Sequence, residues 1–428
     1  MVRKLFFCWP TPTLGLTLGG LMIGLLAAGN LWAQSAPLTL KQAFDEAWAR
    51  QPEAQSLTVR REAAEARRQS ADSWMAEPLA LGLSTQTDQL NNDQGRREYA
   101  AEIAWPMWLP GERTRMATLA DAETRATVSR ALAAQLRMAA TVREAWWDWQ
   151  RARIEQGLAQ DRLNNAQRLA ADVTRRVKAG DLARADQHQA AGAAAGAELA
   201  KAEAEAALAT ATQHLRALTG KRPDLPSTNG VERPVVGEPV PTLPADLSAL
   251  DTTHPAVAEL LDRAEVAQRE AELAEVQTRA NPELMLATTR DRERMGDPYR
   301  QTVSIGLRFP LGSDSRHRAK VGLARAEAIE ATGQWQLERE RLIADLEAAR
   351  IRVESARTQQ TAAEKRAQLA HESRGFFEKS FRLGESDLPT RLRIELEAVD
   401  AERQAARSHI DLAAAVSRLR QALGLLPE

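Results

Sequence analysis

The segment from Tyr299 to Gly312 reads YRQTVSIGLRFPLG. Every second residue in its centre is apolar, namely Val303, Ile305, Leu307 and Phe309, and the residues between them are polar or small. A period of two is the pattern of a β-strand with one apolar and one polar face. Such a strand fits either the boundary between lipid and water or the edge of a soluble sheet, so the rest of the chain has to decide between them.

Three further segments show the same alternation. Leu79, Leu81 and Leu83 alternate with small or polar residues, and after the turn-forming stretch 91–95 the alternating residues are Tyr99, Ala101, Ile103 and Trp105. Leu284 and Leu286 precede a loop over 291–298 that leads back to the opening segment. The sequence therefore predicts two β-hairpins, at 79–108 and 282–310, each with one apolar face.

The chain contains an internal repeat with an offset of about 204 residues. Turn and helix-end residues of the two copies correspond at four places: Gln51-Pro52 with His254-Pro255, Trp105-Pro106 with Phe309-Pro310, Gly180 with Gly384, and Gly220 with Gly424. We expect a first repeat over 34–220, an irregular linker along the outside over 221–250, and a second repeat over 251–428. Each repeat is a helix, a hairpin, a very long helix and a shorter helix, the last two at 112–178 and 185–220 in the first repeat and at 313–381 and 387–424 in the second.

The first predicted helix begins after Thr39, which can form a capping box with Gln42, and continues to about Met75. The long helices contain no proline, and at ~1.5 Å per residue each would be about 100 Å long. Helices of this length need lateral partners, and the alanine-rich stretch 190–211 allows close packing in a coiled coil. Gly180 and Gly384 interrupt the helical pattern and turn the chain back.

Four strands with an exposed apolar face need lipid or a partner. Strands in a membrane must close into a barrel, and a closed barrel needs at least about eight strands. One chain supplies four, so several chains would have to contribute to one barrel. Aromatic residues lie near the strand ends, as in an interfacial girdle: Tyr99, Trp105, Trp108, Tyr299 and Phe309.

Residues 1–33 resemble a secretory signal peptide. Arg3 and Lys4 precede an apolar run over 14–28, and Leu31-Trp-Ala33 offers a cleavage site. A single N-terminal membrane anchor is the alternative, although the run is short of the ~20 residues that a spanning helix needs. Cys8 is the one cysteine, which excludes disulfides, and it does not follow an apolar run, so no lipid anchor is expected. The formal net charge of -1 gives no basic surface for nucleic acid.

The order and spacing of these features resemble the TolC-like outer-membrane efflux proteins. The resemblance covers nearly all of the chain beyond the signal peptide, and four segments carry it: Asn281-Pro-Glu-Leu284, Phe309-Pro-Leu-Gly312, Lys178-Ala-Gly-Asp-Leu182 and Arg382-Leu-Gly-Glu-Ser386. It implies a mainly α protein with a membrane β-barrel portion. Three identical chains would form one twelve-stranded barrel in the outer membrane of a Gram-negative bacterium and a twelve-helix coiled-coil tunnel in the periplasm.

Within that family the strand and turn segments are most similar to the CzcC-type subunits of heavy-metal cation efflux. The resemblance implies a homotrimer surrounded by outer-membrane lipid, with a periplasmic adaptor protein and an inner-membrane RND pump as partners. A channel of the same fold for drugs or for type I protein secretion remains an alternative, as does a periplasmic coiled-coil adaptor without a pore.

A conduit needs a wet lumen, a docking surface and an entrance that can close. The candidates to line the lumen alternate away from the apolar face, although positions on an outer rim would show the same pattern: Glu102, Glu283, Arg300 and Arg308. The candidate adaptor-docking turns, whose glycines could equally be plain helix stops, contain Gly180, Asp181, Leu182, Gly384, Glu385, Ser386 and Leu388. The candidate entrance residues are Asp186, Asp387, Thr390 and Arg393, and we hypothesise contacts between chains through Asp387 and Arg393.

No pattern in the sequence points to catalysis. The six histidines are scattered, without the close helical spacing of a two-histidine metal site. Acidic and basic residues alternate along the helices, as on a solvated face. The chain has no phosphate loop, nucleophile elbow or cofactor motif. We therefore expect no enzyme activity, no cofactor and no metal site.

Overall fold

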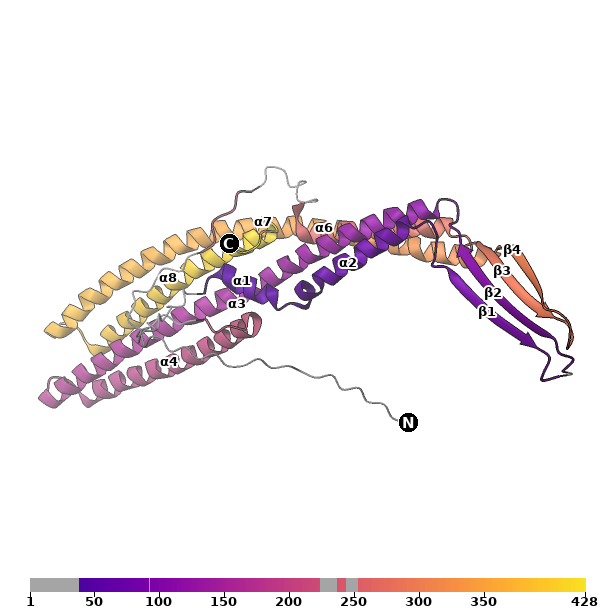
Figure 1. The fold of residues 1–428 in the computed structure, drawn as a ribbon. Coiled ribbons are helices and arrows are strands. Elements are labelled where there is room, and N and C mark those ends of the chain that lie inside the picture. Colours follow the sequence, from indigo (N-terminus) through magenta and orange to yellow (C-terminus); the bar gives the residue numbers. More distant parts are fainter. Residues whose placement is uncertain (1–37, 92, 224–236, 244–252) are drawn as a thin grey trace, which may run out of the picture. The chain divides into compact units, whose positions relative to one another are not determined.

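A computed structural model describes residues 38–91, 93–223, 237–243 and 253–428 (Figure 1). The predicted signal peptide, its cleavage site and Cys8 lie outside the described residues, as does most of the linker. The elements are α1 (Leu40–Ala49), α2 (Pro52–Asp72), β1 (Ala80–Thr87), β2 (Arg97–Pro106), α3 (Glu112–Ala179), α4 (Arg184–Thr219), α6 (Pro255–Val276), β3 (Glu283–Arg292), β4 (Arg300–Arg308), α7 (Asp314–Leu383) and α8 (Leu388–Ala422).

The four strands form one antiparallel sheet in the order β1-β2-β3-β4. The two hairpins are joined because β2 pairs with β3 along its whole length, from Arg97 opposite Arg292 to Pro106 opposite Glu283. The strands therefore lie side by side at one end of the helices, as a single curved sheet (Figure 1). Among the described residues, nothing pairs with the outer edge of β1 or of β4.

The helices pack as two long antiparallel hairpins. α3 packs along α4 and α7 along α8, while α6 lies between α3 and α7 on the side nearer the sheet (Figure 1). The largest hydrophobic core cluster joins α1, α3, α4 and α8. It contains Trp146, Trp147 and Trp149, each less than a tenth exposed. The tryptophans on α3 are thus packing residues. No helix in the described ranges is long and apolar enough to cross a membrane.

Paired glycines mark the ends of the corresponding helices in the two repeats. Gly180 and Gly384 end the long helices with φ of +88° and +78°, and Gly220 and Gly424 follow the shorter ones with φ of +75° and +76°. This left-handed conformation is open to glycine at little cost and stops a helix. Glycines that are 204 residues apart therefore have the same backbone conformation in the two repeats.

The structure corrects the prediction for the first helix. It is interrupted between Ala49 and Pro52, because proline cannot donate the hydrogen bond that a continuous helix requires. The described stretch of the linker, 237–243, has neither helix nor strand, and its residues are partly or fully exposed apart from Glu238, whose side chain is only 2% exposed. The helix and strand bounds given above lie within a few residues of those predicted for the hairpins and the long and short helices, and the Thr39–Gln42 capping box is present.

Candidate functional site

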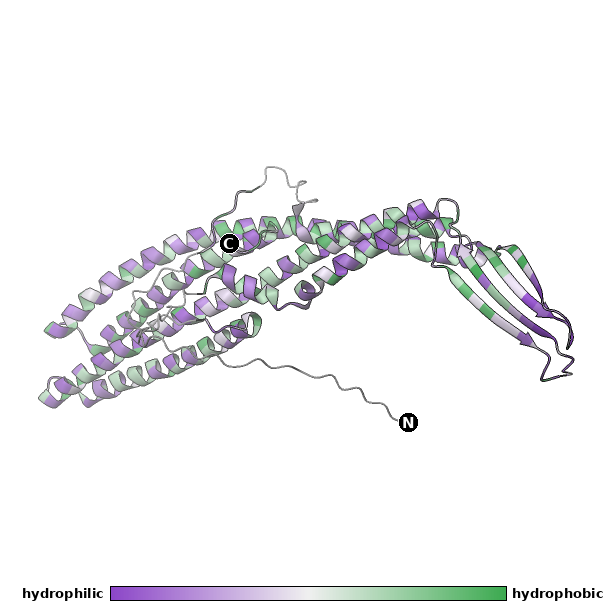
Figure 2. Ribbon diagram, in the orientation of Figure 1, coloured by the Kyte–Doolittle hydropathy of each residue, from purple (hydrophilic) through white to green (hydrophobic). Residues whose placement is uncertain are grey.

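The register of the sheet sorts its side chains into two faces. Facing positions in an antiparallel sheet share a face, so each cross-strand row has one side. One such row is Leu81, Ile103, Leu286 and Ile305, and the row next to it on the same face is Leu83, Ala101, Thr288 and Val303. Leu81, Val303 and Ile305 are 68%, 65% and 77% exposed. One face of the sheet is therefore apolar and unprotected, as Figure 2 shows along the strands.

The opposite face carries the four residues predicted to line a lumen. Glu102 stands in a row with Gly82, and Glu283 lies opposite Arg308, with 2.9 Å between the Arg308 Nη1 and Glu283 Oε2 atoms. Arg300 lies at the loop end of the same face, 3.4 Å from a carboxylate oxygen of Glu293. The structure thus places all four on one face, and it pairs two of them.

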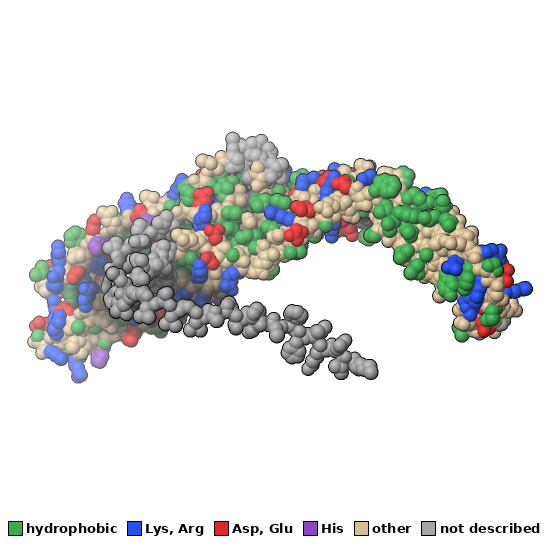
Figure 3. Space-filling model, viewed as in Figure 1, with side chains coloured by type: hydrophobic (Ala, Val, Ile, Leu, Met, Phe, Trp, Pro, Cys, Tyr) green, Lys and Arg blue, Asp and Glu red, His purple; other side chains and the backbone are tan. Residues whose placement is uncertain are grey.

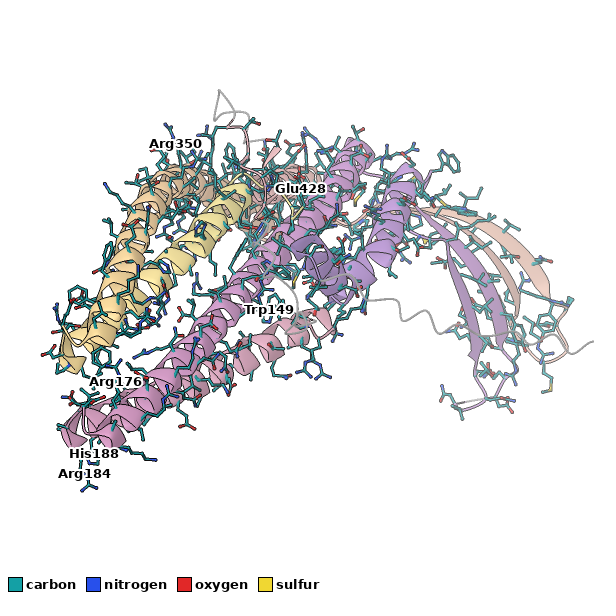
Figure 4. The ribbon with its side chains drawn as sticks, turned by 90° about the vertical axis from the view of Figure 1, so that its left-hand side faces the viewer. Trp149, Arg176, Arg184, His188, Arg350 and Glu428 are labelled. Carbon is teal, nitrogen blue, oxygen red and sulfur yellow. The ribbon has the colours of Figure 1, made fainter. Side chains whose placement is uncertain are left out.

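At the far end of the helices the two turns lie against each other. The guanidinium of Arg176 donates a hydrogen bond of 3.1 Å to the Phe381 carbonyl and lies 5.0 Å from the centre of its ring. Val173, Ala190, Phe381 and Leu388 form the cluster beneath, against which Leu182 also packs. Arg184 and His188 are exposed at this same end (Figure 4).

The predicted docking residues divide into exposed and buried ones. Asp181, Glu385 and both turn glycines are exposed, and Ser386 and Leu182 are partly buried. Leu388 is only 1% exposed, which corrects our expectation that it offers a docking contact: its side chain holds the two hairpins together. Leu383, beside Gly384, was not among the predicted docking residues, but its aliphatic side chain is 74% exposed.

The predicted entrance residues have partners within the chain. Asp387 is the N-cap of α8, and its carboxylate accepts a hydrogen bond of 3.1 Å from the Thr390 backbone N–H. Hydrogen bonds from Thr390 lower the pKa of Asp387, and the positive charge of Arg393 lowers it further. Asp186 accepts a similar bond from the Ala183 N–H, and Arg393 pairs with Glu397 at 3.2 Å.

A buried ion network fixes the linker to the helices. Arg143 on α3 donates two hydrogen bonds, of 3.0 and 2.7 Å, to the carboxylate of Glu238, and Arg420 on α8 lies 3.3 Å from the same carboxylate. Ser417 donates to it as well, and all three charged side chains are at most 4% exposed. No local sequence pattern predicts this network, because Arg143 is 95 residues before Glu238 and Arg420 is 182 residues after it.

The described residues contain no group of three or more histidine, cysteine, aspartate or glutamate side chains that could hold a metal ion. His254 is buried, and its imidazole lies beside the Gln421 backbone. His371 and His409 each lie beside a glutamate on the partner helix of the α7–α8 hairpin, at 3.6 and 3.0 Å. The candidate functional features of the described residues are therefore the two faces of the sheet and the two helix turns.

Comparison with known proteins agrees with this architecture. Residues 43–221 match the sequence profile of a family described as outer membrane efflux protein. No curated protein matches the chain.

Three solved channels show the same fold. CusC, whose structures concern transmembrane channel formation, has a TM-score of 0.74 and 16% identity over 90% of this chain and 92% of its own. The Campylobacter jejuni CmeC outer membrane channel has 0.72 and 14%, over 96% and 94%. The open state of the Neisseria gonorrhoeae MtrE outer membrane channel has 0.70 and 17%, over 90% and 89%. The predicted fold of long helices with four antiparallel strands per chain is therefore confirmed.

Proposed function

We propose that this chain, whose first repeat matches the outer membrane efflux protein family, is the outer-membrane channel subunit of a tripartite RND-type efflux system. The observation that carries the proposal is an open sheet with one exposed apolar face, continuous with two long helical hairpins. A surface of this kind is stable when lipid covers the apolar face and when neighbouring strands satisfy the two free edges.

Closure by identical chains follows from the strand count. With four strands in one meander, β1 and β4 run in opposite directions, so β4 of one copy can pair antiparallel with β1 of the next. At least two copies are needed to reach the ~8 strands of the smallest membrane barrels. The resemblance to TolC-like proteins favours three, which would give twelve strands and a tunnel of long helices in the periplasm.

The two faces then have different environments. The face with Glu102, Glu283, Arg300 and Arg308 lines the lumen, and its mixture of acidic and basic groups suits a water-filled passage. The opposite face is in contact with outer-membrane lipid. The protein acts as a passive conduit and performs no enzymatic reaction.

The exposed turns at Gly180 and Gly384 are the proposed docking site for the periplasmic adaptor, which connects the channel to an inner-membrane RND pump. Asp387 and Arg393 near these turns are the proposed entrance contacts between chains. The double variant Asp387→Ala/Arg393→Ala should raise single-channel conductance, and an unchanged conductance would count against an entrance role.

The proposed cargo is heavy-metal cations, on the basis of the likeness to CzcC-type subunits. Cells that lack the gene should become sensitive to these cations and should regain resistance from a plasmid copy. Sensitivity to drugs alone, or loss of a secreted polypeptide, would assign the same conduit to another pump.

Conductance of the purified protein in a planar bilayer, with its mass measured in the same detergent, tests the central proposal. Discrete current steps from a particle of about three chains are expected. A monomer that stays in solution and never inserts would contradict the channel and favour a periplasmic coiled-coil adaptor.

A further inference from the structure

Arginine side chains gather on the apolar face of the sheet at its loop end. The register continues this face from the row with Leu83 to a row with Thr85, Tyr99, Arg290 and Gln301, and then to Thr87, Arg97 and Arg292. Figure 3 shows basic side chains gathered over this end of the strands. The face thus changes from aliphatic to basic over two rows, a distance of about 13 Å at ~3.3 Å per residue.

Two of these arginines carry charges that no carboxylate in the described residues neutralises. Arg97 is paired with Asp88 and Asp93, at 3.1 and 3.7 Å. The Arg292 guanidinium donates to the Gly95 carbonyl, whereas the Arg290 guanidinium donates no hydrogen bond to any residue that the structure describes. Both guanidinium groups are held by the ring of Tyr299, at 5.2 and 5.0 Å from its centre.

A shallow hollow of about 600 Å³ lies beside Arg290. Its lining includes Leu83, Thr85, Tyr99, Thr288, Arg290 and Gln301. The Gln301 amide donates to the Thr288 hydroxyl at 3.2 Å, and Tyr99 lies 6.4 Å from Tyr299 between ring centres. The hollow is therefore basic and hydrogen-bonding at the loop end and opens toward exposed aliphatic side chains at the other end.

We propose that this surface, which we name the Arg290 surface (Arg290, Arg292, Tyr99 and Tyr299), binds the phosphorylated, negatively charged headgroup of a lipid in the outer leaflet. The proposal rests on the proposed outer-membrane location. Arginine presents a planar fork of N–H donors that matches a phosphate, and tyrosines favour the level at which headgroups meet acyl chains. The acyl chains of the same lipid lie along the rows of Leu81 and Leu83.

A lipid suits this surface better than a protein partner because the charge and the apolar rows are continuous. The row of Leu81 and Ile305 is covered by acyl chains in a membrane, and the Arg290 row lies two rows farther along the same strands. An anion that sits at Arg290 therefore lies at the headgroup level of any lipid that covers Leu81.

Native mass spectrometry of the purified full chain in detergent tests the proposal. The probes are diphosphorylated lipid A and the zwitterionic phosphatidylethanolamine, and inorganic phosphate serves as a competitor. The wild type should retain lipid A in preference to phosphatidylethanolamine. The double variant Arg290→Gln/Arg292→Gln should lose about tenfold or more in lipid A affinity, since charge-assisted hydrogen bonds are removed.

Arg300→Gln is the matched control, because Arg300 is an arginine at the same end of the sheet on the opposite face. It should leave lipid A binding unchanged. Equal loss in this control would overturn the proposal, and so would a wild type without preference for lipid A. If inorganic phosphate at equal concentration displaces lipid A, the surface binds free phosphate and the assignment to a lipid is overturned.

Conductance in bilayers of phosphatidylethanolamine separates the two proposals. Current steps from a wild type that shows no preference for lipid A would leave the channel standing and remove the lipid site. A wild type that neither inserts nor conducts would overturn both.

Discussion

At the scale of single residues, burial decides which charges matter. Many ion pairs in the described parts of the chain lie at the surface, within one helix or between neighbouring helices, and such pairs contribute at most about 1 kcal/mol. The pair of Arg143 and Glu238 is different because both side chains are at most 4% exposed. A buried charge that loses its partner cannot be solvated in place, so the network with Arg420 is sensitive to the loss of its one central carboxylate.

The variant Glu238→Leu should lower the free energy of unfolding by about 3–5 kcal/mol, because it leaves the buried Arg143 guanidinium without its carboxylate. It also removes one of the two carboxylates beside Arg420, the other being Glu428 at 2.8 Å. The matched control is Glu259→Gln, which removes one partner of the exposed pair with Arg137, whose side chains are 60% and 24% exposed. The control should cost no more than about 1 kcal/mol. Denaturant midpoints of the two variants check the difference, and equal midpoints would show that the linker is not held by this network.

His254 makes stability depend on pH. Burial lowers its pKa, so the folded chain keeps the imidazole neutral. The unfolded chain takes up the proton near pH ~6.5, so this contribution to stability is complete above that pH and is lost as the pH falls below it. The thermal midpoint of the wild type should therefore fall more steeply between about pH 7 and 5 than that of His254→Leu. The exposed His188→Gln variant should follow the wild type, and parallel curves for His254→Leu and the wild type would contradict the argument.

At the scale of helices and strands, much of the structure could be predicted because local pattern determines it. The alternation of Val303, Ile305 and Leu307 predicted strand β4 and its apolar face, and Gly180 and Gly384 predicted the ends of the long helices. The break before Pro52 was missed, although the proline itself was the signal for it. The Glu238 network could not be predicted, because its burial depends on how distant helices pack and not on any local pattern.

The paired glycines should differ in their tolerance of a side chain. At Gly384 an added Cβ meets no atom within 4 Å, so Gly384→Ala costs only the left-handed conformation, about 1–2 kcal/mol. At Gly424 the Cβ would lie 2.7 Å from Cδ of Pro255 and 2.9 Å from Cδ2 of His254. Gly424→Ala should therefore lower the thermal midpoint more than Gly384→Ala, and the reverse order would contradict the packing of the chain end on α6.

At the scale of the whole molecule, one chain alone cannot close its four-stranded sheet into a barrel. The sequence predicted an apolar face and too few strands for a barrel, and the structure adds two free edges of similar length, eight residues in β1 and nine in β4. In the proposed assembly, strands of neighbouring copies pair with these edges and lipid covers the apolar face. The proposed association is therefore argued from the sheet and not from the helices.

Pairing of β4 with β1 of a neighbouring copy can be tested with engineered disulfides, because Cys8 is the sequence's one cysteine. Ser84 in β1 and Thr302 and Ser304 in β4 lie on the polar face, whereas Val303 lies on the apolar face. Ser84→Cys combined with Thr302→Cys or Ser304→Cys should give crosslinked dimers and trimers on a non-reducing gel for whichever position matches the register. Ser84→Cys with Val303→Cys should remain uncrosslinked, since side chains on opposite faces cannot meet the geometry of a disulfide. Crosslinks at Val303, or at none of the three positions, would contradict closure through these two edges and leave the four strands to be covered in another way.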